Sequence, residues 1–141
     1  MVFETYSQEE TENLARQVSA NAKPGDIFCL EGGLGAGKTV FAKGFAHGMG
    51  ILEEITSPTF AIVNVYQGGL ALYHFDVYRI KHISEMEDTG YEEYFYGGGV
   101  CLIEWAGLIK GIIPGNATWV SILRDYNKED DYRKVIIGVR P

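Results

Sequence analysis

The feature that most constrains this chain is the pattern G-x-x-x-x-G-K-T, which runs from Gly32 to Thr39. Glycines allow backbone N–H groups to converge on phosphate oxygens. Lys38 supplies a mobile positive charge, and the hydroxyl of Thr39 can take one magnesium position. A helix that begins here directs the positive end of its dipole at an anion. The pattern therefore predicts a phosphate-binding loop.

The residues on either side agree with the strand–loop–helix context that such a loop requires. Residues 26–31 form a short apolar run after a Pro-Gly turn and predict a strand. After the loop, Phe41, Phe45 and Gly48 recur at helical spacing. A glycine-rich turn that binds nothing is the alternative, and the agreement on both sides argues against it.

Size and charge restrict the class of protein further. The chain has 141 residues, which suits one domain over residues 1–141 and is too few for two. Its net charge of −7 makes it a poor stand-alone binder of nucleic acid, because neutralising phosphates requires clustered Lys and Arg. We therefore expect any contact with RNA to go through partner proteins or a local patch.

Other compositional signals point to the cytoplasm. No apolar run approaches the roughly 18 residues of a membrane-spanning helix, and the N-terminal region does not resemble a secretory signal. Cys29 and Cys101 lie inside apolar runs, so we expect buried thiols and no zinc site. The three histidines show no metal-ligand spacing, and we expect core or surface roles for them. The interpretation is a cytoplasmic protein without a membrane segment.

The order of the predicted elements indicates an α/β fold, in which helices flank a sheet of mixed parallel and antiparallel strands. Ser7 and Glu10 match a capping box, which predicts a helix that ends near Asn21. A Gly-Gly pair at 68–69 predicts a hairpin, and residues 84–95 predict one or two short helices. The predicted strands are residues 2–6, 26–31, 61–67, 70–78, 100–105, 118–123 and 134–139.

Two acidic residues, Asp76 and Glu104, stand at or near the ends of predicted core strands. A nucleoside triphosphatase needs an acidic group near its magnesium ion, at the carboxyl end of such a strand. A carboxylate directly after buried apolar residues is costly unless something pairs with it, and a metal ion is a natural partner. An ordinary salt bridge or a solvated rim position is the alternative for each.

Two further residues are candidates because of where they stand. Thr59 places a hydroxyl on a loop that the preceding proline restricts, and such a threonine can sense an outer phosphate. Its alternative role is to cap the loop. Trp105 directly follows Glu104, and it either covers a nucleotide edge or fills the core.

Four segments, residues 32–39, 57–60, 74–79 and 102–105, in this order and spacing, resemble the TsaE (YjeE) family over nearly the whole chain. The resemblance implies a small bacterial ATPase that uses ATP and Mg²⁺. It implies work with TsaB and TsaD, after TsaC has made the activated intermediate, to install threonylcarbamoyl on the adenosine beside the anticodon of tRNAs that read codons beginning with A. The ATPase is then required for turnover and does not itself transfer the group.

The same resemblance implies roles for individual residues. Lys38, Asp76 and Thr59 would be catalytic, as the phosphate lysine, the acid implicated in hydrolysis and the hydroxyl of a switch loop. Thr39 and Glu104 would hold magnesium. The implied nucleotide-binding residues are Gly33, Leu34, Gly35, Ala36, Gly37, Lys38, Thr39, Thr11, Trp105 and Arg133.

The chain departs from the family pattern at two places. Gly33 stands where the family usually has an Asp, which removes an acid beside the outer phosphate and keeps the glycines that cradle it. Ala106 and Gly107 stand where the family often has Pro-Glu or Ala-Glu, so a contact from that Glu would be missing.

Two other functions share the phosphate loop. A small-molecule kinase would need arginines in a lid, whereas Lys and Arg total only 12 here and no Arg-rich lid segment is visible. A nucleotide-gated adaptor would share every binding residue and differ only in turnover.

Overall fold

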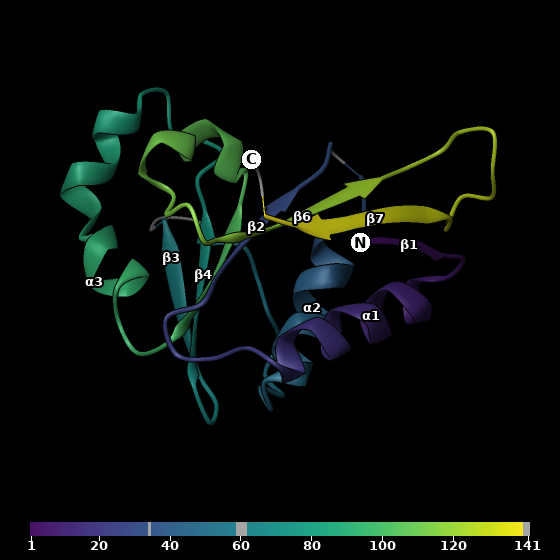
Figure 1. The fold of residues 1–141 in the computed structure, drawn as a ribbon, viewed down its shortest axis with the longest axis horizontal. Helices are drawn as coiled ribbons and strands as arrows, with labels where there is room; N and C mark the ends of the chain where they lie inside the picture. The colour runs from purple at the N-terminus through teal and green to yellow at the C-terminus, as the bar shows by residue number, and fades with distance from the viewer. Residues whose placement is uncertain (34, 59–61, 140–141) are drawn as a thin grey trace.

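The computed structural model describes residues 1–33, 35–58 and 62–139. Within these ranges the centre of the molecule is a sheet with the strand order β1-β7-β6-β2-β5-β4-β3 (Figure 1). The strands are β1 Val2–Thr5, β2 Ile27–Glu31, β3 Val63–Gln67, β4 Ala71–Asp76, β5 Val100–Glu104, β6 Thr118–Leu123 and β7 Arg133–Gly138. The helices are α1 Gln8–Ala20, α2 Lys38–Gly48 and α3 Tyr91–Phe95, and the 3₁₀ segments are η1 Ile83–Thr89 and η2 Ala106–Ile112.

The sheet mixes parallel and antiparallel pairs, as predicted. Strand β2 pairs in parallel with β5 on one side and with β6 on the other, and β5 pairs in parallel with β4. The antiparallel pairs β3–β4, β6–β7 and β1–β7 complete the two edges. Every residue of β5 is buried, which is what a central strand covered on both faces requires.

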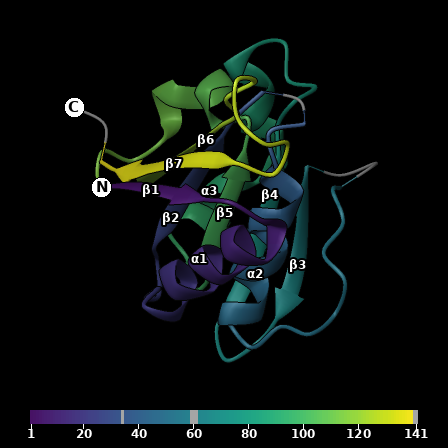
Figure 2. The same cartoon turned by 90° about the vertical axis from the view of Figure 1, so that its right-hand side faces the viewer.

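Each face of the sheet is covered by a different set of helices. Helices α1 and α2 lie side by side on one face, where Leu14 and Phe45 belong to the same buried core as Leu30 of β2 (Figure 2). Segments η1, α3 and η2 cover the other face, with Met86 and Phe95 in that second core (Figure 1). The carboxyl ends of the parallel strands therefore remain available for a site between the two layers.

Local sequence signals account for the first helix. The hydroxyl oxygen of Ser7 accepts a hydrogen bond from the backbone N–H of Glu10 at 3.1 Å, and the helix runs to Ala20 with Asn21 as its C-cap. The carboxylate of Glu10 reaches back one residue further than a capping box requires, to the N–H of Tyr6 at 3.2 Å. The predicted start and end of this helix are thus confirmed.

The differences from the predicted strands lie at strand ends. Strand β5 stops at Glu104, one residue short of the prediction, because Trp105 has a left-handed backbone with φ 62°. Strand β4 covers Ala71–Asp76, which is shorter than the predicted run of residues 70–78. Residue 61, the first of another predicted strand, lies outside the described residues.

The two thiols are buried, as predicted. Cys29 and Cys101 are both buried, and neither forms a disulfide with another described residue. Burial raises the pKa of the Cys101 thiol to about 12. Among the described residues, no helix combines the length and the apolar character needed to cross a membrane.

Candidate functional site

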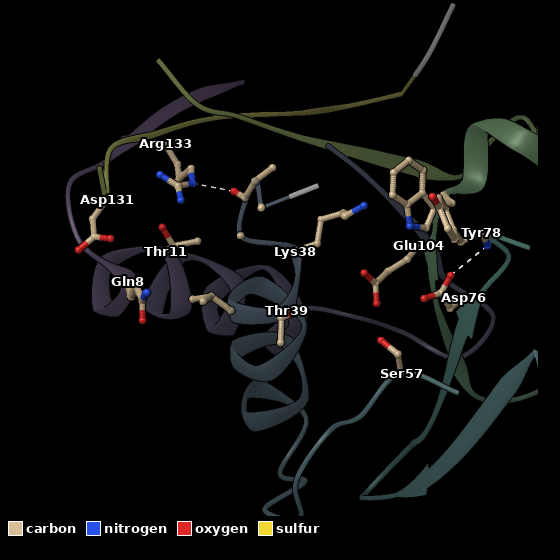
Figure 3. Close-up of a pocket in the computed structure, with 15 residues that line it drawn as sticks. Gln8, Thr11, Lys38, Thr39, Ser57, Asp76, Tyr78, Glu104, Asp131 and Arg133 are labelled. Carbon is tan, nitrogen blue, oxygen red and sulfur yellow. Dashed lines mark hydrogen bonds between the residues drawn. The ribbon is translucent and has the colours of Figure 1, made fainter. Parts of the chain in front are cut away.

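A pocket of about 470 Å³ lies at the carboxyl ends of β4 and β5, next to the first turn of α2 (Figure 3). The loop 35–37 and the start of α2 form its middle. One end is lined by Ser57, Asp76, Tyr78, Glu104 and Trp105, and the other by Gln8, Thr11, Asp131 and Arg133. The pocket is thus long enough to have an acidic end and a separate end beside α1.

The loop between β2 and α2 needs glycine at particular places. Gly35 and Gly37 have φ values of 75° and 102°, in the left-handed region that favours glycine. A Cβ on Gly32 would lie 2.8 Å from the carbonyl oxygen of Ile122, which is too close for any side chain. Gly37 is the N-cap of α2 and supplies no side chain to cap the first turn, so that turn can donate its N–H groups to an anion.

Lys38 is buried beside the glycine loop and the two acids. Its side chain is 8% exposed, and within the described part of the chain its Nζ has no hydrogen-bond partner. The Nζ lies 3.5 Å from the centroid of the Trp105 ring, a cation–π contact. Burial lowers the pKa of Lys38, while Glu104 and Asp76 act in the opposite direction. An ammonium in this state gains much from an anionic ligand, and a phosphate would supply one.

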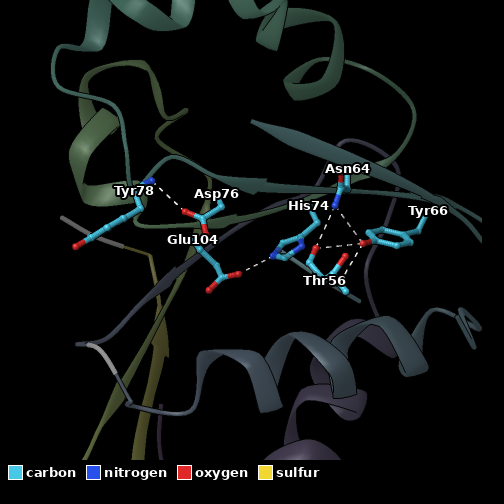
Figure 4. A network of polar contacts seen from close by, with 7 residues as sticks. All are labelled: Thr56, Asn64, Tyr66, His74, Asp76, Tyr78 and Glu104. Carbon is cyan, nitrogen blue, oxygen red and sulfur yellow. Dashed lines mark hydrogen bonds and ion pairs between the residues drawn. The ribbon is translucent and has the colours of Figure 1, made fainter. Parts of the chain in front are cut away.

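The two predicted acids are brought together by strand register. Asp76 of β4 and Glu104 of β5 are direct partners across the parallel pair, and both line the pocket (Figure 3). The Oδ1 of Asp76 accepts a hydrogen bond from the backbone N–H of Tyr78 at 3.0 Å. The Oε2 of Glu104 lies 2.7 Å from the Nε2 of His74 (Figure 4). Glu104 is buried, and Asp76 is partly buried.

Thr11 and Arg133, both predicted to bind the nucleotide, lie at the other end of the pocket. Thr11 is 2% exposed, and its hydroxyl contacts Thr5 Oγ1 at 2.6 Å, so it is already used within the protein. Arg133 donates from Nε to the carbonyl of Ala36 at 2.6 Å. The structure therefore gives Arg133 a bond to the phosphate loop itself.

Of four other predicted nucleotide-binding or catalytic residues, one lines the pocket, one lies beside it, and two are not among the described residues. Trp105 is partly buried, lines the pocket, and stacks obliquely on Tyr78 with ring centroids 4.7 Å apart. Gly33 is exposed at the loop, beside the main pocket and outside its lining. Leu34 and Thr59 lie outside the described residues. Ser57, two residues before Thr59 in the sequence, lines the pocket.

The sequence did not indicate several of the residues that line the pocket. Gln8 lies one turn before Thr11 on α1, and helical spacing is the signal that would have found it. Asp131 and Tyr78 each stand two residues from a predicted site residue. For Tyr78 no sequence signal distinguishes a pocket residue from an ordinary exposed aromatic.

The available donors fit a magnesium ion that arrives with a triphosphate. Thr39 is exposed and lines the pocket together with Asp76 and Glu104, so the nearby donors are oxygens. No cluster of three or more His, Cys, Asp or Glu that could hold a metal occurs in the described ranges. Magnesium is typically held by one or two carboxylates together with substrate phosphates and water.

A glycine loop that joins a central parallel strand to a helix, with acids on the next strands, defines a P-loop nucleotide-binding α/β domain. A family model described as "Threonylcarbamoyl adenosine biosynthesis protein TsaE" matches residues 5–135. The chain belongs to the TsaE family, as the sequence resemblance predicted.

Individual relatives agree with this assignment. A Bacillus subtilis (strain 168) protein named "tRNA threonylcarbamoyladenosine biosynthesis protein TsaE" is 48% identical over 139 residues, covering 98% of this chain and 87% of the relative. A Treponema pallidum (strain Nichols) protein of the same name is 43% identical over 125 residues, covering 87% and 93%. The fold is similar to the crystal structure of YdiB from Bacillus subtilis, with a TM-score of 0.80, 44% identity, and coverage of 99% of this chain and 86% of that one.

Proposed function

We propose that residues 1–141 form a single P-loop ATPase domain, the ATP-hydrolysing subunit required for threonylcarbamoyladenosine modification of tRNA next to the anticodon. The observation that carries this proposal is the buried Lys38 Nζ, which has no acceptor among the described residues and lies beside a glycine loop and two acids. A triphosphate would supply the missing acceptor. Membership of the family named for this biosynthesis supplies the pathway.

Each part of the pocket has a task in ATP hydrolysis. The backbone N–H groups of the loop and the ammonium of Lys38 would bind the outer phosphates. Thr39 and Glu104 would hold Mg²⁺, which when bound neutralises charge on the phosphate oxygens. Asp76 would orient the attacking water with Oδ2, because the N–H of Tyr78 holds its Oδ1. The hydroxyl of Thr59 would sense the outer phosphate.

The proposed setting is a cytoplasmic complex with TsaB and TsaD. The net charge of −7 argues against strong direct binding of tRNA, so contact with tRNA would be indirect. Turnover by the isolated chain would be slow if the partners complete the site. Pull-down of TsaB and TsaD with this chain, in the presence and absence of ATP, tests the assembly.

The family assignment supports this function over a small-molecule kinase. Of the described residues that line the pocket, the cations are Lys38 and Arg133, and Arg133 already bonds the carbonyl of Ala36. A clamp for a second phosphate acceptor is therefore lacking in that lining. A nucleotide-gated adaptor would bind ATP equally well, and it differs by releasing no phosphate.

Lys38→Ala tests the site directly. We expect loss of ATP binding by isothermal titration calorimetry and loss of phosphate release in the presence of TsaB and TsaD, because the substitution removes the one side-chain ammonium among the described residues that line the pocket. Lys43→Ala, at an exposed position on the same helix, is the matched control and should retain both. If Lys38→Ala bound and hydrolysed ATP as the unmodified chain does, the site assignment would be wrong.

A further inference from the structure

A buried histidine lies directly behind one of the two pocket acids. His74 stands on β4 and is 1% exposed, while Glu104 on β5 is 6% exposed. The His74 Nε2 and the Glu104 Oε2 are 2.7 Å apart (Figure 4). The sequence predicted only a core or surface role for this histidine. Its contact with Glu104 was not indicated by any motif.

The hydrogen-bond partners of the two ring nitrogens of His74 indicate which nitrogen carries the proton. The other ring nitrogen, Nδ1, is buried and has no hydrogen-bond partner among the described residues. A proton on Nδ1 alone would leave a buried donor unsatisfied and would set the bare Nε2 against a carboxylate oxygen, and both arrangements are unfavourable. His74 therefore donates an Nε2–H hydrogen bond to Glu104.

The strand geometry shows which part of Glu104 this bond leaves available. His74 and Asp76 are two residues apart on β4, so their side chains leave the same face of the sheet. Glu104 is the register partner of Asp76 on β5. His74 thus binds Glu104 Oε2 from the interior, while the carboxylate is directed into the pocket (Figure 3).

We propose that His74 is a positioning residue that orients the Glu104 carboxylate toward the Mg²⁺ that accompanies ATP. The inference rests on the proposed function. A carboxylate held by a buried donor cannot rotate freely, so it meets the ion in one orientation without paying for ordering at the moment of binding. Removing a hydrogen-bond partner of this kind typically lowers metal affinity by about 10- to 100-fold.

A purely structural pair is the competing explanation, and the two differ in their dependence on magnesium. Loss of a buried hydrogen bond destabilises the fold in both cases. Only a positioning role predicts that the gain in ATP affinity on adding Mg²⁺ falls when the donor is lost. Only the donor hypothesis predicts rescue by a side chain that places an N–H at the same point.

His74→Leu and His74→Gln form the matched pair for this test. Leucine fills the space without a donor, whereas the glutamine amide nitrogen extends about as far from the backbone as the histidine Nε2. Isothermal titration calorimetry with ATP, in excess EDTA and in excess Mg²⁺, gives the magnesium-dependent gain for each variant, and thermal unfolding gives stability. We expect the magnesium-dependent gain in ATP affinity to fall by about 10-fold or more in His74→Leu, with little change in the ATP affinity measured in EDTA. His74→Gln should keep most of the gain.

Combining His74→Leu with Glu104→Ala tests whether His74 acts through the Glu104 carboxylate. We expect adding His74→Leu to the Glu104→Ala variant to change the magnesium-dependent gain no further, because the group that His74 orients is absent. A His74→Leu variant that unfolds at lower temperature yet keeps the full gain would overturn the proposal. So would a His74→Gln variant that behaves as the leucine variant does.

The outcomes also separate this inference from the proposed function. If His74→Leu fails to fold, the comparison passes to His74→Gln and His74→Asn, because the shorter asparagine amide cannot reach Glu104 and should lose the gain. An unmodified chain that binds ATP equally with and without Mg²⁺ would refute the positioning role and leave the ATP site standing. An unmodified chain that binds no ATP would refute the proposed function first.

Discussion

Arg133 connects the phosphate loop to a strand nearly a hundred residues away in the sequence. Its Nε donates to the carbonyl of Ala36 at 2.6 Å. Its Nη1 donates to the carbonyls of Asp130 and Tyr132 at 2.5 Å and 2.7 Å. One guanidinium therefore joins the carbonyl of Ala36 to the start of β7.

Arg133→Ala is expected to weaken ATP binding by about 10-fold, since a hydrogen bond from a charged group contributes about 1.5–3 kcal/mol and part of it serves to order the loop. Fluorescence titration with a labelled nucleotide measures the change. Lys134→Ala, at the exposed neighbouring position, is the control and should bind as the unmodified chain does. Unchanged binding by Arg133→Ala would show that the loop needs no anchor from β7.

Gly33 allows the missing family acid to be restored. Its built Cβ meets no described heavy atom within 4 Å, so a side chain there is accommodated. We expect Gly33→Asp to lower the Mg²⁺ concentration needed for half-maximal phosphate release by several-fold, with stability changed by less than about 0.5 kcal/mol. Gly33→Asn has the same shape without the charge and should leave the Mg²⁺ requirement unchanged. Equal effects of the two substitutions would exclude an electrostatic role for the acid.

At the scale of elements, the contact between α1 and α2 depends on small residues. A Cβ on Gly44 of α2 would collide with the backbone carbonyl of Glu12 on α1. Gly48, one turn further on, is similarly close to the backbone of Arg16. The two helices approach so closely because glycine is present where they cross.

Gly44→Ala is expected to destabilise the fold by about 1–3 kcal/mol, because backbone atoms cannot move aside as a flexible side chain can. The better helix propensity of alanine, about 1 kcal/mol, offsets part of the clash. Thermal unfolding measures the net change, which at this chain length corresponds to roughly 2–4 °C per kcal/mol. Lys43→Ala on the exposed side of α2 should shift the midpoint little. A midpoint unchanged in Gly44→Ala would mean that the helices can separate freely.

Most elements could be predicted because their signals are local. The Ser7 cap, the apolar run of β5 and the hairpin between β3 and β4 all lie within short stretches of sequence. Strand ends were less predictable, because the left-handed backbone of Trp105 ends β5 where apolar character alone would continue it. Asp76 and Glu104 could be proposed as site residues, yet their pairing depends on strand register, which no local pattern specifies.

At the scale of the whole molecule, the first strand and the last hairpin hold each other. Strand β1 pairs with β7 at one edge of the sheet (Figure 1). Beside this pair, the hydroxyl of Tyr132 donates to the carboxylate of Glu4 at 2.7 Å. This bond raises the pKa of Tyr132 to about 12, and the same bond is the largest cause that lowers the pKa of Glu4.

The two shifts define the pH range over which this tie is expected to stabilise the fold. The lowered pKa of Glu4 means that its contribution is present above the ordinary value of 4.5 and is lost as pH falls through the folded-state pKa. The raised pKa of Tyr132 means that its contribution is present below the ordinary value of 10.0 and is lost as pH rises through about 12. Stability should therefore be lost at both extremes.

Tyr132→Phe should reduce stability by a constant amount between about pH 5 and pH 10, and by less outside that window, because the donor is missing. Urea unfolding at a series of pH values measures the difference from the unmodified chain. Tyr126→Phe, at a site that is 81% exposed, is the control. A difference that is the same at every pH would contradict the assignment of the tie to this hydrogen bond.

The sequence by itself determined the phosphate loop, the order of helices and strands, and the family, because each is written in residues that are close together along the chain or in motifs of known spacing. Only the tertiary structure decided that Glu104 meets His74, that Arg133 bonds Ala36, and that the Nζ of Lys38 is buried without an acceptor in the described residues. These contacts join strands and loops distant in sequence. They exist because sheet register and helix packing bring such groups together, and neither is expressed in any one segment.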